Sequence, residues 1–156
     1  MKKITVTEAR ELFSKAKNNG ERVEALTILE LYCTQYNPYL AGDLGGDVYA
    51  PSLGNVQVKY MDGCIRVPNA TTGNKVNDLR TALESDASDI WCIWFNLNEY
   101  MVINKWDFFN TIANKLNTEE LIRYNTRSGE ETLRLECGTG KRKYFFGKVR
   151  QRVRAV

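Results

Sequence analysis

Apolar residues in the first third of the chain recur at helical spacing. Residues 5–19 predict a first helix with Thr7 as its N-cap, because a threonine hydroxyl can accept a hydrogen bond from the first turn. Residues 21–37 predict a second helix, since apolar side chains from Val23 to Cys33 repeat every three or four positions. The chain therefore begins with a pair of helices, and the second ends near the following proline.

The next segment alternates apolar and polar residues, which is typical of strands with one buried face. Residues 46–50, 56–61 and 64–68 predict three strands joined by short turns. Asp62-Gly63 is a strong hairpin signal, because these residues readily adopt the backbone angles of a two-residue loop. The segment therefore predicts two consecutive hairpins.

The remainder of the chain alternates strand-like and helix-like patterns. Asn104 is the expected N-cap of a helix, with Asp107 at the capping-box position. The predicted elements are helices over 75–85 and 105–116, and strands over 89–97, 100–103, 131–137 and 143–154, of which the last two form a hairpin. This order predicts an α/β (α+β) fold with a mixed central sheet flanked by helices, in a single domain spanning residues 1–156.

Register in the first hairpin places polar side chains of neighbouring strands together. If the turn is symmetric about Ser52, Asp47 lies directly opposite Gln57. Lys59 lies on the same face as Gln57, because side chains alternate along a strand. The valines of these strands point to the opposite face, toward a core. The alternative is an ordinary solvent-facing surface, on which acidic, amide and basic residues are common.

The second hairpin checks this arrangement independently. A two-residue turn at Asp62-Gly63 pairs Lys59 with Arg66 and places valine opposite valine, so polar residues meet polar residues. Two cations that face each other repel unless an anion lies between them. The predicted patch is therefore suited to a phosphate group.

Composition narrows the chemistry that this chain can perform. The chain contains no histidine, which excludes Ser-His-Asp hydrolysis, Cys-His proteolysis, HNH-type nuclease chemistry and His-ligated metal sites. Its four cysteines are far apart and form no C-x-x-C pair, which indicates buried thiols rather than a zinc site or a disulfide framework. No apolar run is long enough for a membrane span or a signal peptide, so we expect a cytoplasmic protein with no membrane partner.

Positive charge is concentrated in the segment 141–154. It holds seven of the 22 Lys and Arg residues and no acid, which leaves a net charge of about −4 on the rest of the chain. As a strand, its alternation places four cations on one face, where each can contact a phosphate. The residues predicted to contact DNA are Arg66, Lys141, Arg142, Lys143, Lys148, Arg150, Arg152 and Arg154. The alternative is a solvated basic strand at the edge of a sheet.

The stretch GGDVYAPSLGNVQVKY, residues 45–60, resembles the core motif of the PD-(D/E)XK, or restriction-endonuclease-like, nucleases. It is most similar to the Mrr-like variant, in which Gln replaces the middle acid. In this family an Asp near the start of one strand is followed by a hairpin and then by an apolar-Gln-x-Lys segment. The family fold consists of a helix, a three-stranded meander, a helix and a further strand, and the element order predicted over residues 20–115 is similar.

The resemblance implies a catalytic set. Asp47 falls on the metal-binding acid of the family, Gln57 on its second ligand position and Lys59 on its catalytic lysine. The family often adds an acid from the preceding helix. The candidates for that acid are Glu21, Glu24 and, as a third choice, Glu30.

The implied chemistry is Mg²⁺-dependent hydrolysis of DNA phosphodiester bonds. Mg²⁺ prefers oxygen ligands, for which Asp47, the Gln57 side-chain oxygen and the Val58 carbonyl are the candidates, and Mn²⁺ is expected to substitute. Lys59 would orient or help to deprotonate the attacking water and stabilise charge on the phosphate. Because the chain leaves no room for a separate recognition domain, we expect a homodimer or an enzyme that recognises DNA structure.

Two other hypotheses compete with the endonuclease. One is a catalytically weak or inactive nuclease-fold module that binds nucleic acid or a protein, as in a mobile-element or phage-type accessory protein. The neutral Gln57 favours this module, because it leaves a metal with one acid fewer. The other hypothesis is a host-interaction inhibitor whose fold is incidental to its activity.

Overall fold

The computed structural model of this chain describes residues 3–33, 39–40, 47–61, 64–68, 75–113, 122–127, 130–136 and 149–156. In the ranges 39–40, 64–68, 122–127 and 130–136 it describes the backbone only. The chain divides into two compact units. The first comprises Met1–Tyr60, Ala87–Ile103 and Lys148–Val156, and the second comprises Met61–Asp86 and Asn104–Gly147. The number of independently folding domains stays a prediction.

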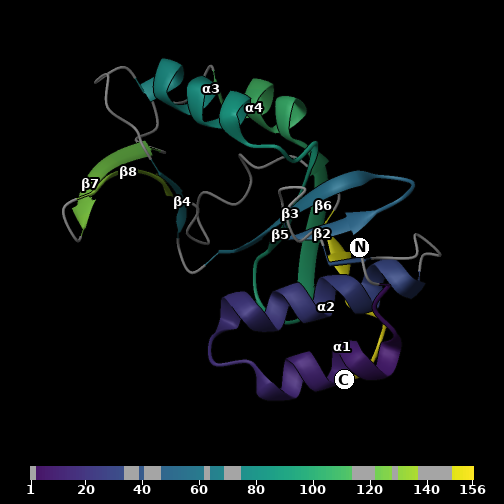
Figure 1. The fold of residues 1–156 in the computed structure, drawn as a ribbon. Helices are drawn as coiled ribbons and strands as arrows, with labels where there is room; N and C mark the ends of the chain where they lie inside the picture. The colour runs from purple at the N-terminus through teal and green to yellow at the C-terminus, as the bar shows by residue number, and fades with distance from the viewer. Residues whose placement is uncertain are drawn as a thin grey trace. The chain divides into compact units, whose positions relative to one another are not determined.

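The first unit begins with the two predicted helices, α1 (Val6–Lys15) and α2 (Asn19–Cys33). The N-cap of α1 is Thr5, whose hydroxyl oxygen accepts a hydrogen bond from the Glu8 amide at 3.1 Å. The prediction of Thr7 as the cap is therefore wrong. Thr5 has the extended backbone of an N-cap, whereas Thr7 lies within the helix. Thr5 also lies three residues before Glu8, whose N–H donates to its hydroxyl. Helix α1 packs on α2, as Figure 1 shows.

The sheet of the first unit is mixed. Its strands are β1 (Tyr39–Leu40), β2 (Val48–Ala50), β3 (Gly54–Tyr60), β5 (Ile90–Trp94), β6 (Glu99–Asn104) and β9 (Arg150–Gln151). They lie in the order β1-β2-β3-β5-β6-β9. Strand β3 is antiparallel to β2 and parallel to β5. The predicted fold class, a mixed sheet with flanking helices, is confirmed.

Helix α2 covers one face of this sheet and forms the main core with it. Val23, Leu26 and Leu29 of α2 are almost fully buried in one cluster with Val56 and Val58 of β3. The same cluster includes Cys92 and Trp94 of β5. Burial raises the pKa of the Cys92 thiol to about 12, so this cysteine is an inert core residue, as predicted.

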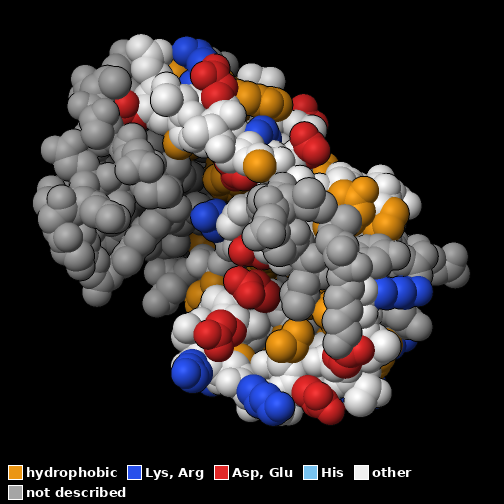
Figure 2. Space-filling view, in the orientation of Figure 1, with side chains coloured by type: hydrophobic (Ala, Val, Ile, Leu, Met, Phe, Trp, Pro, Cys, Tyr) orange, Lys and Arg blue, Asp and Glu red, His pale blue; other side chains and the backbone are white. Residues whose placement is uncertain are grey.

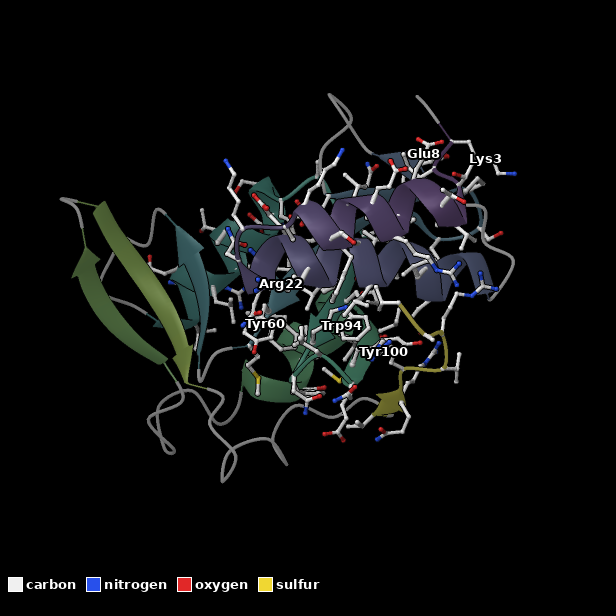
Figure 3. All side chains as sticks on the ribbon, turned by 90° about the horizontal axis from the view of Figure 1, so that it is seen from below. Lys3, Glu8, Arg22, Tyr60, Trp94 and Tyr100 are labelled. Carbon is white, nitrogen blue, oxygen red and sulfur yellow. The ribbon has the colours of Figure 1, made fainter. Side chains whose placement is uncertain are left out.

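A buried polar contact joins α2 to the sheet within this core. The Trp94 indole nitrogen donates to the Thr27 hydroxyl at 2.8 Å, and that hydroxyl donates to the Val23 carbonyl at 2.7 Å. The Trp94 ring also stacks on Tyr100, with centroids 4.5 Å apart, and Figure 3 shows the two side by side. The polar atoms of the indole and the hydroxyl are therefore satisfied in an apolar environment.

The first predicted hairpin has the predicted register. Val48 pairs with Val56, and Ala50 pairs with Gly54, so the turn is symmetric about Ser52. Gly54 adopts a φ of 84°, which a glycine tolerates better than any other residue. The alternation of apolar and polar residues therefore predicted the register of this hairpin correctly.

The second predicted hairpin does not form. Strand β4 (Cys64–Pro68) pairs with β8 (Glu130–Glu136) in another sheet, and β5 occupies the second edge of β3. Strand β5 is apolar on both faces, which requires a central position between two strands. Burial of both faces of β5 outweighs the local turn signal at Asp62-Gly63. The three-stranded meander therefore begins with β1, a strand that was not predicted from the sequence.

The second unit combines two helices with a three-stranded antiparallel sheet. Its helices α3 (Lys75–Ser85) and α4 (Lys105–Ala113) agree with the predicted segments, of which residues 114–116 lie outside the described part of the chain. The Asn104 side-chain oxygen accepts from the Trp106 amide at 2.8 Å, so the predicted cap is confirmed. The ammonium of the buried Lys105 donates to the Leu83 carbonyl at 2.7 Å, near the end of α3.

The sheet of the second unit has the strand order β4-β8-β7, with β7 at Ile122–Arg127. Strand β8 pairs with β4 and β7, whereas β9 pairs with β6 in the first unit. The predicted late hairpin between residues 131–137 and 143–154 is therefore wrong. The strand that pairs with this edge of β8 is instead β7. It was not predicted from the sequence, because its mixed composition gave no alternating signal.

Candidate functional site

Asp47 lies at the start of β2, next to the middle of β3. Its backbone N–H donates to the Val56 carbonyl at 3.0 Å. Its side-chain oxygen Oδ2 then accepts from the Val58 N–H at 2.9 Å. The carboxylate thus takes the place of a backbone carbonyl and extends the pairing of β3 beyond the end of β2.

Gln57 contacts the same carboxylate oxygen. Its side-chain nitrogen Nε2 donates to Asp47 Oδ2 at 2.9 Å. Both side chains are partly buried, and the strand register places the two residues opposite each other. The predicted juxtaposition of Asp47 and Gln57 is confirmed, while their chemical role stays a prediction.

Glu24 of α2 supplies a second carboxylate near Asp47. Burial, followed by the negative charges of Asp47 and Glu21, raises the pKa of Glu24 to about 7. A carboxyl group with this pKa is only partly ionised at neutral pH, because the charged form lacks enough compensating positive charge. The negative charge of Asp47 thus contributes to the raised pKa of Glu24.

The other two helix acids have structural contacts. Glu21 is exposed, and its side chain accepts from the Lys17 N–H at 2.7 Å, at the start of α2. Glu30 is 2% exposed, and its oxygen Oε1 accepts from the N–H groups of Val153 and Arg154, each at 3.1 Å. Its other oxygen accepts from the Tyr100 hydroxyl at 3.1 Å.

Tyr100 completes the buried contact of Glu30. Burial, and then the Glu30 carboxylate, raise the pKa of the Tyr100 hydroxyl, which therefore stays a protonated donor. The sequence reading missed this use of Glu30, although an acid within the apolar face of a helix is a signal for a buried partner.

Lys59 lies two residues beyond Gln57 on the same face of β3. Its ammonium nitrogen is 5.6 Å from the centroid of the Trp91 ring. Trp91 belongs to β5 and pairs with Gln57 in the parallel register. Gln57 and Lys59 therefore lie on the face opposite to the valines, whereas Glu24 comes from α2, the helix that packs on the valine face.

Two of the acids named above are of the kind that can supply oxygen ligands to a cation. Asp47 and Glu24 carry carboxylates, a ligand type that Mg²⁺ prefers, whereas Gln57 turns its amide nitrogen toward Asp47, and the role of its oxygen as a ligand stays a prediction. Across the part of the chain that the structure describes, no group of three His, Cys, Asp or Glu side chains is placed to hold a metal ion. The Val58 N–H contacts Asp47, and the role of the Val58 carbonyl as a metal ligand stays a prediction.

The predicted basic patch is only partly within the described residues. Lys141, Arg142, Lys143 and Lys148 lie outside them, and Arg66 has a described backbone only. Because β4 pairs with β8, Arg66 pairs with Arg134 and does not lie opposite Lys59. The predicted pairing of Lys59 with Arg66 is wrong, for the reason given for the second hairpin.

The end of the chain is held against the sheet. Strand β9 contains only Arg150 and Gln151, so the predicted long alternating strand is wrong at this end. The Arg152 guanidinium donates to the Leu97 carbonyl at 2.9 Å, the Arg154 carbonyl at 2.7 Å and the Asn98 side chain at 3.2 Å. These contacts bend the chain away from a regular strand and fix Arg152 in place.

Figure 2 shows acidic and basic side chains interspersed over the region of α1 and α2.

Comparison with models of known protein families, with curated proteins and with solved structures finds no match to this chain. None of the helices in the described residues is both long enough and apolar enough to span a membrane.

Proposed function

We propose that this protein is a Mg²⁺-dependent endonuclease that hydrolyses DNA phosphodiester bonds, with its site at Asp47, Gln57, Glu24 and Lys59. The observation that carries the proposal is the contact between the Gln57 side-chain nitrogen and Asp47 Oδ2 at 2.9 Å, with Lys59 two residues further along the same face of β3. Glu24 of α2 adds a second acid, because burial, and then the negative charge of Asp47, raise its pKa to about 7. Such an acid pair is costly for the fold and is typical of a site that binds a cation or a proton.

The topology of the first unit supports the nuclease resemblance. Helix α2 is followed by the antiparallel strands β1, β2 and β3, and a helix-containing connection then leads to β5, parallel to β3. This is the element order that the resemblance implies. Asp47 lies at the start of the middle strand, and the Gln57-x-Lys59 segment lies in the third strand.

Each residue has a distinct role in the proposed site. Asp47 and Glu24 would bind the cation, and the Gln57 and Val58 N–H groups would hold the Asp47 carboxylate in position. Bound Mg²⁺ supplies an acidified water and neutralises charge on the phosphate. The Lys59 ammonium would contact a phosphate oxygen and stabilise the charge that develops on it.

The test is cleavage of plasmid, branched and single-stranded DNA by the purified protein with Mg²⁺ or Mn²⁺. We expect cleavage by the unaltered protein and a loss of at least about 100-fold in Asp47→Asn and Lys59→Gln. Glu11→Gln is the matched control, because Glu11 is an exposed acid of α1 outside the site. Cleavage that persists in Asp47→Asn and Lys59→Gln would exclude this site.

A second candidate function is nucleic-acid binding without hydrolysis. It is favoured by the neutral Gln57, which leaves the site with two acids from Asp47 and Glu24. Salt-sensitive binding of DNA with no cleavage in either metal would select this function, because phosphate contacts weaken as salt increases.

A further inference from the structure

The Lys59 side chain lies over the face of an aromatic ring that is buried in the sheet. Its ammonium nitrogen is 5.6 Å from the centroid of Trp91, within the range of a cation–π interaction. Trp91 is 2% exposed and lies in the central strand β5. The ring is therefore fixed, whereas a lysine side chain alone has many rotamers.

The parallel register explains why the two side chains meet. Gln57 pairs with Trp91, and Lys59 pairs with Ile93, so Trp91 lies on the same face as both polar residues of β3. The ammonium thus lies above a ring that is anchored beside Gln57, and Gln57 itself contacts Asp47. The Trp91 ring, the Gln57 amide and the Asp47 carboxylate thus follow one another across the adjacent strands β5, β3 and β2.

We propose that Trp91 is a positioning residue, whose indole face holds the ammonium of Lys59 on the Gln57 side of the sheet, where it meets the phosphate of a bound DNA strand. This inference rests on the proposed function. The π-face attracts the ammonium and reduces the number of positions that the flexible side chain occupies before DNA binds.

Trp94 provides a matched control on the same strand. It is fully buried, but its side chain faces α2, where it donates to Thr27 at 2.8 Å and stacks on Tyr100. A change at Trp94 therefore affects the core without touching Lys59. Comparing the two tryptophans separates loss of lysine positioning from loss of core packing.

The experiment measures kcat and KM for cleavage of a double-stranded oligonucleotide with Mg²⁺ by the full chain and its Trp91→Leu, Trp91→Phe and Trp94→Phe variants. We expect Trp91→Leu to lower kcat about tenfold with KM changed less than about twofold, and Trp91→Phe to lower kcat less, because phenylalanine keeps a weaker π-face. Trp94→Phe should leave kcat within about twofold of the unaltered protein.

A second readout does not depend on cleavage. Reductive ¹³C-methylation of the lysines gives one signal per side chain, and the signal absent from Lys59→Arg identifies Lys59. We expect that signal to be shifted upfield by the Trp91 ring, to keep part of that shift in Trp91→Phe and to lose it in Trp91→Leu.

The outcomes distinguish this inference from the proposed function. No cleavage by the unaltered protein overturns both. Cleavage with equal kcat in the unaltered protein and both Trp91 variants overturns the positioning role alone, as does a Lys59 signal that Trp91→Leu leaves unchanged. An equal loss of kcat in Trp94→Phe and Trp91→Phe also overturns it, because core packing then explains the effect.

Discussion

Glu24 and Glu30 belong to the same helix and have opposite environments. Glu30 is 2% exposed, yet its carboxylate accepts hydrogen bonds from two backbone N–H groups and one hydroxyl. Glu24 is less buried than Glu30, and burial, followed by the negative charges of Asp47 and Glu21, raises its pKa to about 7. The more buried acid is thus the one supplied with hydrogen-bond donors.

This difference separates a structural acid, Glu30, from the acid that we propose to bind a cation, Glu24. A buried carboxylate that is fully hydrogen-bonded stabilises the fold and connects the end of the chain to α2. A carboxylate that faces another carboxylate reduces stability until a cation or a proton arrives. Glu30 therefore has a structural role, and the cation-binding role of Glu24 and Asp47 stays a proposal.

The largest effect is expected at the structural acid. Glu30→Leu should lower the free energy of unfolding by about 3 kcal/mol, because the N–H groups of Val153 and Arg154 and the Tyr100 hydroxyl lose their acceptor. Urea denaturation monitored by tryptophan fluorescence measures this change. The isosteric Glu30→Gln should lose only about 1 kcal/mol, since its carbonyl oxygen can still accept. An equal loss in both variants would mean that the donors do not depend on Glu30.

A smaller effect is expected at the hydroxyl that contacts Glu30. Tyr100→Phe removes one donor and keeps the ring that stacks on Trp94, so we expect a loss of about 1 kcal/mol in the free energy of unfolding. The same urea experiment applies. If Tyr100→Phe were as stable as the unaltered protein, the hydroxyl would contribute nothing to holding Glu30.

The smallest effect is expected at Glu24, where substitution should raise the free energy of unfolding at high pH instead of lowering it. Its pKa is raised in the folded protein, so the stability linked to its protonation is present below about pH 4.5 and is lost as the pH rises through about 7. Without divalent ions, Glu24→Gln should therefore be more stable than the unaltered protein at pH 8, by about 0.5 kcal/mol for a half-buried group. The two proteins should be nearly equal at pH 4. Thermal unfolding at both pH values measures the difference, and a less stable Glu24→Gln at pH 8 would contradict the assignment.

The parts of the structure that could be predicted from sequence are those set by local pattern. The register of Asp47 opposite Gln57 follows from alternation and a short turn, and the Asn104 cap follows from its side chain. The partners of β4 and β8 could not be predicted, because pairing between distant strands depends on which apolar surfaces need covering. The turn signal at residues 62–63 carries no information about the competitor β5.

The same limit applies to the site. Asp47, Gln57 and Lys59 could be placed together because they belong to one hairpin. Which helix acid completes the site stays a prediction, because the effect of Asp47 on Glu24 and the buried donors around Glu30 depend on tertiary structure. Trp91 was not identified either, because its position beneath Lys59 depends on the parallel pairing of β3 and β5.

The most direct test of the cation site is calorimetric titration of the purified protein with Mn²⁺ at pH 7.5 without DNA. We expect saturable binding by the unaltered protein and by the Glu11→Gln control, and at least about tenfold weaker binding by Asp47→Asn and by Glu24→Gln, since each removes one of the two carboxylates. Equal Mn²⁺ affinity in all four proteins, or no binding by any of them, would contradict the assignment of Asp47 and Glu24 as a cation site.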